Sequence, residues 1–142
     1  MRDEPGFSLI ELLVVMAIIG LIAALAVPNL KRARQQALSS SAIQSMRTIT
    51  TAEALYERKY RRYAVLFDLS PEGTLDSHLK LGVKSHYKFS ITLAADQVHY
   101  TVTATPILDP AEMNHYFTDQ SAVIRFNLGA PADATSDPIP AK

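Results

Sequence analysis

Hydrophobic side chains fill the first part of the chain almost without interruption. From Phe7 to Val27 the only polar side chains are those of Ser8 and Glu11. Because a helix rises about 1.5 Å per residue, a run of this length reaches across the hydrocarbon core of a bilayer, which is about 30 Å thick. We therefore expect a membrane-spanning helix. An ionised side chain in such a segment is costly, so the carboxylate of Glu11 needs a charge partner.

The apolar positions follow only one side of a helix after Pro28. Over residues 31–62 they are separated by three or four residues, which predicts an amphipathic helix that continues the first segment. We expect one helix from Phe7 to about Tyr60, apolar on all sides over residues 7–30 and one-sided beyond. The positions that follow this spacing are Leu30, Ala33, Ala37, Ile43, Met46, Ile49, Ala52, Leu55 and Tyr56.

A period of two replaces the helical period in the segment HYKFSITLAADQVHYTVTAT. Apolar and polar side chains alternate on both sides of a loop at Ala94–Gln97, which predicts an antiparallel hairpin whose second strand ends at Pro106. Pairing Leu93 with Val98 places the apolar side chains on one face of this hairpin. The opposite face, open to solvent or to a neighbouring subunit, holds Lys88, Ser90, Thr92, His99, Thr101 and Thr103.

Two further segments have weaker patterns. The run SAVIRFNL, Ser121–Leu128, predicts a third strand, and residues 74–83 are compatible with a short helical turn that ends at Gly82. Residues 106–120 have no decisive pattern.

The remaining residues are predicted to form a loop and a tail of a small globular head. Ser70–Gly73 has the composition of a loop, and residues 129–142, rich in proline and alanine, are expected to be extended and poorly ordered. The globular head would then span residues 63–128. The expected fold class is α+β, with a long N-terminal helix packed against a small antiparallel sheet.

Charge is distributed unevenly, although the formal net charge is zero. Eight basic residues lie between Lys31 and Arg62, against Glu53 and Glu57, and acidic residues predominate from Glu72 onward. A basic segment followed by an acidic one is compatible with binding of nucleic acid or anionic lipid, although we expect no nucleic-acid partner. The same asymmetry would also let the basic stem of one copy dock to the acidic head of another.

The sequence contains no recognisable catalytic or metal-binding constellation. It has no cysteine, no G-x-S-x-G elbow and no glycine-rich phosphate loop. Tyr56, Tyr60, Tyr63 and Phe67 recur at helical spacing, which we interpret as packing under a sheet. We therefore expect a protein that is not an enzyme and that has no metal or other cofactor. The histidines, which lack metal-ligand spacing, are His78, His86, His99 and His115.

The segment GFSLIELLVVMAIIGLIAALAVPNL, Gly6–Leu30, resembles the N-terminal segment of type IV pilins and type II secretion pseudopilins. In that family a short polar leader ends in glycine, and a dedicated peptidase cuts after it at the cytoplasmic face. The new N-terminal residue, usually phenylalanine, is methylated, and the fifth mature residue is glutamate. The resemblance implies a leader over residues 1–6, cleavage between Gly6 and Phe7, methylation of Phe7, and Glu11 as the family glutamate.

The resemblance also implies roles for three positions inside the span. Glu11 would pair with the N-terminal amine of a neighbouring subunit in a growing filament. Gly20 and Pro28 are candidates for local helix unwinding in that filament, and a simple kink of a membrane helix is the alternative. A second segment, FTDQSAVIRF, resembles a segment of short pilins that ends in D-x-S-G-V-I-R, with Ala122 where glycine is usual.

The function implied is that of a structural pilin in a type IV pilus-like filament. The chain would wait in the inner membrane with its head outside the cytoplasm, and a pilus or secretion assembly platform with its ATPase would build it into a homo-oligomeric, extracellular helical fibre. Lys31, Arg32 and Arg34 follow the span, and the positive-inside rule alone favours the opposite orientation. We give precedence to the leader, which must face the cytoplasm to meet the prepilin peptidase.

Three alternatives stay open from the sequence. A type II secretion pseudopilin would share the same N-terminal chemistry. A minor tip pilin would bind DNA, through the basic residues of Arg58–Arg62, or a surface. An enzyme anchored by an uncleaved span would keep its leader. The sequence does not choose among motility, adhesion, DNA uptake and secretion.

Overall fold

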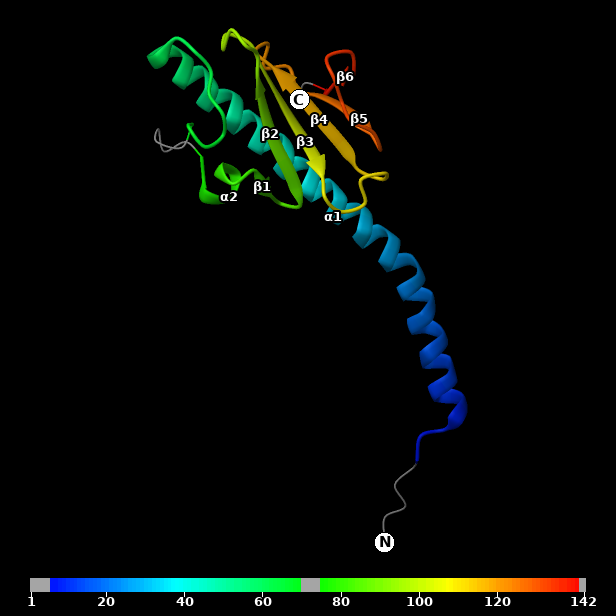
Figure 1. Cartoon of the computed structure of the whole chain (residues 1–142). Coiled ribbons are helices and arrows are strands. Elements are labelled where there is room, and N and C mark those ends of the chain that lie inside the picture. Colours follow the sequence, from blue (N-terminus) through cyan, green and yellow to red (C-terminus); the bar gives the residue numbers. More distant parts are fainter. Residues whose placement is uncertain (1–5, 70–74, 141–142) are drawn as a thin grey trace. The chain divides into compact units, whose positions relative to one another are not determined.

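The computed structural model describes residues 6–69 and 75–140 (Figure 1). It comprises two units, Met1–Gln36 and Ala37–Lys142. Helix α1 (Leu9–Tyr60) contributes to both. The predicted loop at Ser70–Gly73 and residues 1–5 of the predicted leader lie outside the described residues.

The described part of the N-terminal unit consists of the first half of α1 and the three residues before it. The helix begins at Leu9, two residues later than predicted, and passes through Pro28 without interruption. None of its side chains before Gln35 is buried. Among the described residues, α1 is the one helix that is long and apolar enough to cross a membrane. An apolar surface of this extent requires a lipid or protein environment.

The head contains an antiparallel sheet whose strands are neighbours in chain order (Figure 1). The short helix α2 (Ser77–Lys80) precedes the sheet. The described strands are β1 (Val83–Lys84), β2 (Tyr87–Leu93), β3 (Tyr100–Pro106), β4 (Asn114–Asp119), β5 (Arg125–Leu128) and β6 (Asp137–Pro138). This arrangement confirms the predicted α+β class.

The core of the head lies between the second half of α1 and one face of the sheet. Met46 and Ile49 of α1 are fully buried, as are Tyr87 of β2 and Val102 of β3. Burying each such side chain contributes about 1.5–3 kcal/mol relative to leaving it exposed. The opposite sheet face carries Lys88 and other polar residues, so the predicted division into an apolar and a polar face is confirmed.

Helix α1 ends at Tyr60 because the next residue reverses the backbone. Arg61 has φ +58°, and its N–H donates to the carbonyl of Glu57 at 2.7 Å. This single bond is the αL type of helix C-cap. The predicted end of the helix at about Tyr60 is therefore confirmed.

The predicted hairpin register was wrong by two residues. Leu93 pairs with Tyr100 rather than with Val98, so the loop is six residues long, Ala94–His99. The carboxylate of Asp96 accepts the N–H of Val98 at 3.0 Å, and Gln97 has φ +56°. The loop therefore includes Val98 and His99, which the prediction had placed in the strand. A shift of two preserves the face of the side chains that lie in β2 and β3, so their face assignment was correct. Val98, predicted on the apolar face, instead lies in the loop and is 51% exposed.

The C-terminal part of the head differs more from the prediction. The third predicted strand begins at Arg125 instead of Ser121, and β4 occupies a stretch for which no structure had been predicted. The tail, expected to be poorly ordered, forms β6 against β5 and places Ala132 in a buried position. The helical turn predicted near Gly82 is present as α2.

Gly129 occupies a position that should not tolerate a side chain. Its φ is +72°, and a Cβ there would lie 2.6 Å from the carbonyl oxygen of Ala111. Gly129→Ala is expected to lower the free energy of unfolding of the head by about 1–3 kcal/mol. Thermal unfolding of the full chain in detergent, followed by circular dichroism, would measure this. Gly20→Ala is the control, because a Cβ at Gly20 meets nothing within 4 Å. Equal melting temperatures for the two variants would contradict the expectation.

Candidate functional site

The residues around the predicted cleavage point are accessible. Gly6 and Phe7 precede α1 and belong to no helix or strand, and Phe7 is 84% exposed. A peptidase needs an extended, reachable segment, and local structure at such positions would hinder it.

Glu11 has a partner within its own chain, in addition to the one that the family resemblance implies. Its Oε2 accepts the backbone N–H of Ser8 at 3.0 Å, and the carbonyl of Ser8 accepts the N–H of Leu12 at 3.3 Å. Ser8 thus stands at the N-cap of α1, and Glu11 closes one half of an S-x-x-E capping box. The sequence SLIE contains this pattern, so it could have been recognised before the structure was known. One oxygen of the carboxylate is engaged in this contact, which leaves the second oxygen for another partner.

The other predicted residues of the span lie inside α1. A Cβ at Gly20 would meet no neighbour, so this glycine is not required by packing within the chain. Pro28 lacks an N–H, and the carbonyl four residues earlier, that of Ala24, therefore loses its usual helical donor. Glycine and proline both lower helix stability, so we expect the helix of the span to be least stable near Gly20 and Pro28.

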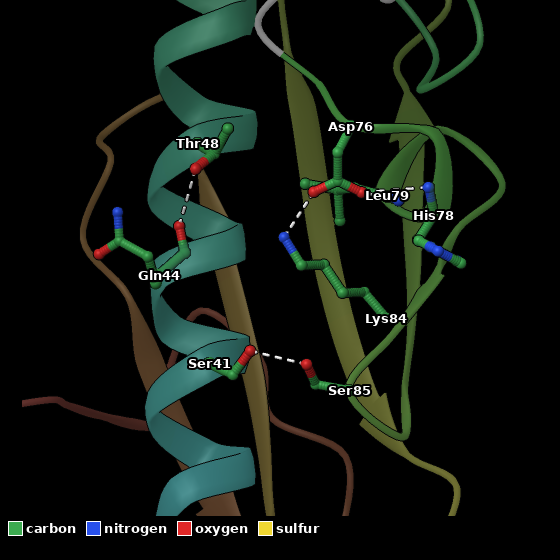
Figure 2. Close-up of polar contacts among 8 residues, drawn as sticks. All are labelled: Ser41, Gln44, Thr48, Asp76, His78, Leu79, Lys84 and Ser85. Carbon is green, nitrogen blue, oxygen red and sulfur yellow. Dashed lines mark hydrogen bonds and ion pairs between the residues drawn. The ribbon is translucent and has the colours of Figure 1, made fainter.

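One side-chain hydrogen bond joins the turn after β1 to α1 (Figure 2). The hydroxyls of Ser41 on α1 and Ser85 share a hydrogen bond of 2.7 Å. Ser85 and His86 form the two-residue turn between β1 and β2, with φ of +50° and +61°. Positive φ at both positions is the type I′ geometry that matches strand twist. Positive φ raises the conformational free energy of Ser85 and His86, and the hydrogen bond with Ser41 helps to stabilise this turn.

Asp76 begins α2 and anchors the β1 edge of the head (Figure 2). Its Oδ1 accepts the N–H groups of His78 and Leu79 at 3.0 and 2.9 Å, and its Oδ2 pairs with the ammonium of Lys84. The Lys84 ammonium and these amides hold the pKa of Asp76 below its ordinary value. Because Asp76 is exposed, we assign this cluster a structural role in positioning α2 against β1.

Glu53 is an unexpected feature of the core. It lies on the inner face of α1 with 0% of its surface exposed, and its Oε2 accepts the N–H of Ala64 at 3.0 Å. Its Oε1 is buried and has no partner among the described residues. Burial raises its pKa to about 7, an effect that the Ala64 hydrogen bond partly opposes. Glu53 follows Ile49 by four residues and Met46 by seven, so helical spacing already indicated this face.

Two tyrosines accompany Glu53. The rings of Tyr63 and Tyr100 lie 4.5 Å apart. Burial and, to a smaller extent, the nearby Glu53 raise the pKa of the Tyr100 phenol. The backbone N–H of Tyr63 donates to the carbonyl of Gln97 at 2.9 Å. The segment after α1 is thus tied both to the helix, through Glu53, and to the β2–β3 loop.

The basic residues at the end of α1 are exposed. The guanidinium of Arg62 reaches the amide oxygen of Gln97 at 3.5 Å, and the ammonium of Lys59 lies 5.0 Å from the centre of the Tyr60 ring. Within the described residues, no three histidine, aspartate or glutamate side chains are close enough together to hold a metal ion.

Comparisons with known proteins agree with the N-terminal pattern. A family model described as the prokaryotic N-terminal methylation motif matches residues 1–27. The type IV wide pilus major component PilA4 of Thermus thermophilus is 35% identical over 98 residues, which cover 67% of this chain and 69% of that protein. No solved structure matches the chain.

Two further relatives match shorter stretches. The type IV major pilin protein PilA of Myxococcus xanthus is 37% identical over 59 residues, which cover 42% of this chain and 27% of that protein. The type II secretion system core protein G of Aeromonas hydrophila is 34% identical over 62 residues, 44% of this chain and 43% of that protein. With its apolar N-terminal helix, its antiparallel head and these relatives, the chain belongs to the family of type IV pilins and type II secretion pseudopilins.

Proposed function

We propose that this protein is a structural subunit, a pilin, of a type IV pilus-like filament. The observation that carries the proposal is the match to the wide pilus major component. It extends over 98 residues, whereas α1 has only 52, so the likeness includes part of the head as well as the shared N-terminal segment. The exposed apolar surface of α1 supports the same function, because many copies of such a helix can bury one another in a fibre core.

Processing at Gly6–Phe7 belongs to this proposal. Cleavage there would remove residues 1–6 and create a cationic amine on Phe7, which would then be methylated. Both residues are exposed and precede the helix, as a peptidase substrate requires. The peptidase, the assembly platform and its ATPase are the proposed partners, and copies of the chain itself are the main one.

Glu11 would pair with the Phe7 amine of a neighbouring copy. Inside a bundle of apolar helices an unpaired carboxylate is strongly unfavourable, whereas a paired one is tolerated. A carboxylate that is acceptable only in one register would therefore favour that register. The capping contact to Ser8 uses one oxygen and is compatible with this second role.

Gly20 and Pro28 would permit the helix between them to unwind in the fibre. Gly20→Ala is expected to stabilise the helix by about 1 kcal/mol, because alanine loses less backbone freedom than glycine. Since the added methyl group meets nothing within the chain, any loss of filaments would reflect the fibre rather than the subunit. We expect filament yield to fall while membrane insertion is unchanged. Unaltered yield would contradict a need for unwinding at this position.

Before assembly the chain would lie in the inner membrane with its head outside the cytoplasm. The apolar helix supports membrane anchoring. The orientation follows from the requirement that the leader meet its peptidase. Labelling of a cysteine placed at Lys88 with a membrane-impermeant reagent would test it, because Lys88 is exposed and the chain has no cysteine of its own.

A pseudopilin is the second candidate, favoured by the likeness to core protein G. Shearing of cells, followed by immunoblotting of the released material, distinguishes the two functions. A pilin is expected as an abundant component of sheared fibres, and a pseudopilin is expected to stay with the membrane. Capture of DNA or attachment to a surface would require the chain at the fibre tip, and the comparisons offer no specific support for it.

A further inference from the structure

A groove opens on the side of the head that carries the C-terminal strands. It has a volume of about 490 Å³, and its apolar walls come from Ile43 of α1, Tyr116 of β4, Phe126 of β5 and Ile139. The exposed side chain of Arg47 lines it as well. A cavity of this size has room for a large side chain. An exposed apolar groove with a charged side chain at its border is typical of an interaction site.

Such a pair of residues projects from the opposite side of the head. Phe67 is 66% exposed, more than any other aromatic side chain among the described residues of the head, and Asp68 follows it. Leu66 and Leu69 on either side are buried, and the N–H of Asp68 donates to the carbonyl of Val65 at 2.9 Å. The buried leucines fix this turn, so Phe67 is held outward. We call residues 65–68 the Phe67 turn.

The Phe67 turn and the groove cannot meet within one molecule. The ammonium of Lys80 in α2 lies 4.5 Å from the Phe67 ring, and α2 adjoins β1, at one edge of the sheet. The groove lies beside β5 and β6, at the other edge. Figure 1 shows α2 and β1 at one edge of the sheet and β5 and β6 at the opposite edge.

Arg47 at the groove and Asp68 in the Phe67 turn carry opposite charges. Neither the guanidinium of Arg47 nor the carboxylate of Asp68 has an ion-pair partner among the described residues. A contact that buries Phe67 in the groove would bring an acid to the border where Arg47 lies. Opposite charges at the rim favour the correct encounter and disfavour alternatives.

We propose that the Phe67 turn of one copy docks into the groove of the next copy, with Asp68 facing Arg47. This inference rests on the proposed function and names the contact between neighbouring heads. Because the two surfaces differ and lie at opposite edges, the contact is heterologous, and its repetition generates a ring or an open helical array. A helical array is the form that a fibre of these subunits requires.

Cross-linking between engineered cysteines tests the contact directly. A chain that carries Val65→Cys and Ile139→Cys is co-expressed with the unaltered chain, and sheared filaments are oxidised. Val65 is an exposed residue of the Phe67 turn, so this variant keeps the Phe67 ring. Because the natural chain has no cysteine, covalent species can form only between the introduced thiols. We expect a ladder of dimers and larger species. Each single variant should give none, and neither should Lys88→Cys with Ile139→Cys. Filaments that form but give no ladder would overturn the proposal.

Charge reversal provides a second test. Arg47→Glu and Asp68→Arg are each expected to reduce sheared filaments about tenfold or more, because each places like charges together. The double variant is expected to recover most of the yield. Lys88→Glu, which changes the net charge as Arg47→Glu does, should have little effect. Failure of the double variant to recover, or an equal loss with Lys88→Glu, would overturn the contact. Absence of filaments from the unaltered chain would instead refute the proposed function.

Discussion

Glu11→Ala is expected to leave membrane insertion and cleavage before Phe7 intact and to reduce the yield of sheared filaments at least about a hundredfold. Removing one partner of a buried ion pair costs about 3–5 kcal/mol, since the other charge is left uncompensated, and each 1.4 kcal/mol is a factor of ten. Quantitative immunoblots of the sheared and membrane fractions measure the two outcomes separately.

Glu11→Gln separates the two possible roles of this residue. The amide oxygen of glutamine can still accept the N–H of Ser8, so the cap of α1 is retained while the charge is lost. If the charge pair matters, Glu11→Gln should lose filaments as Glu11→Ala does. Normal filaments from Glu11→Gln would show that Glu11 acts only as a helix cap, and the proposed pairing would be wrong.

The head is expected to become less stable as the pH rises from about 4.5 to about 7, because of Glu53. In the unfolded chain this carboxyl ionises near its ordinary pKa of 4.5, whereas burial raises the pKa in the folded head to about 7. Between these values the folded state holds a proton that the unfolded state has released, so raising the pH favours unfolding. The contribution of this group amounts to at most about 3 kcal/mol and is constant above pH 7.

Thermal unfolding of the full chain in detergent would measure this effect through the near-ultraviolet circular dichroism of the head tyrosines. Glu53→Gln is the matched control, because it keeps an acceptor for the N–H of Ala64 and cannot ionise. The variant should lack the fall in stability between pH 4.5 and 7 and should exceed the natural chain in stability at pH 8. The same pH profile for both proteins would show that Glu53 does not titrate in this range.

The patterns that could be predicted from the sequence were those with a long period. The apolar span, its amphipathic continuation and the two-residue alternation of the hairpin each extend over many residues, so errors at single positions do not alter them. The end of α1 at Tyr60 and the faces of β2 and β3 followed from these patterns. The span also contained the residues on which the family resemblance depended.

What could not be predicted depended on local hydrogen bonds or on contacts between distant segments. The loop closed by Asp96 moved the pairing of Leu93 by two residues, a choice that face alternation cannot detect. Strand β6 forms by pairing with the edge of β5, a contact between segments that composition does not reveal. The composition of the tail had instead suggested disorder. Glu53 was counted among the charges of the stem, although its spacing from Ile49 placed it on the buried face.

The proposed site was predicted only in part. Gly6, Phe7 and Glu11 came from the family pattern, and their roles in cleavage, methylation and pairing stay predictions. The groove beside Phe126 and the Phe67 turn required the structure, because they bring together residues far apart in sequence.

Mass spectrometry of fibres sheared from the cell surface tests the central claim most directly. We predict an abundant chain that begins at Phe7 and is heavier than the unmodified mature chain by one methyl group. A chain that keeps Met1, or that is absent from the sheared material, would contradict the function of a processed pilus subunit.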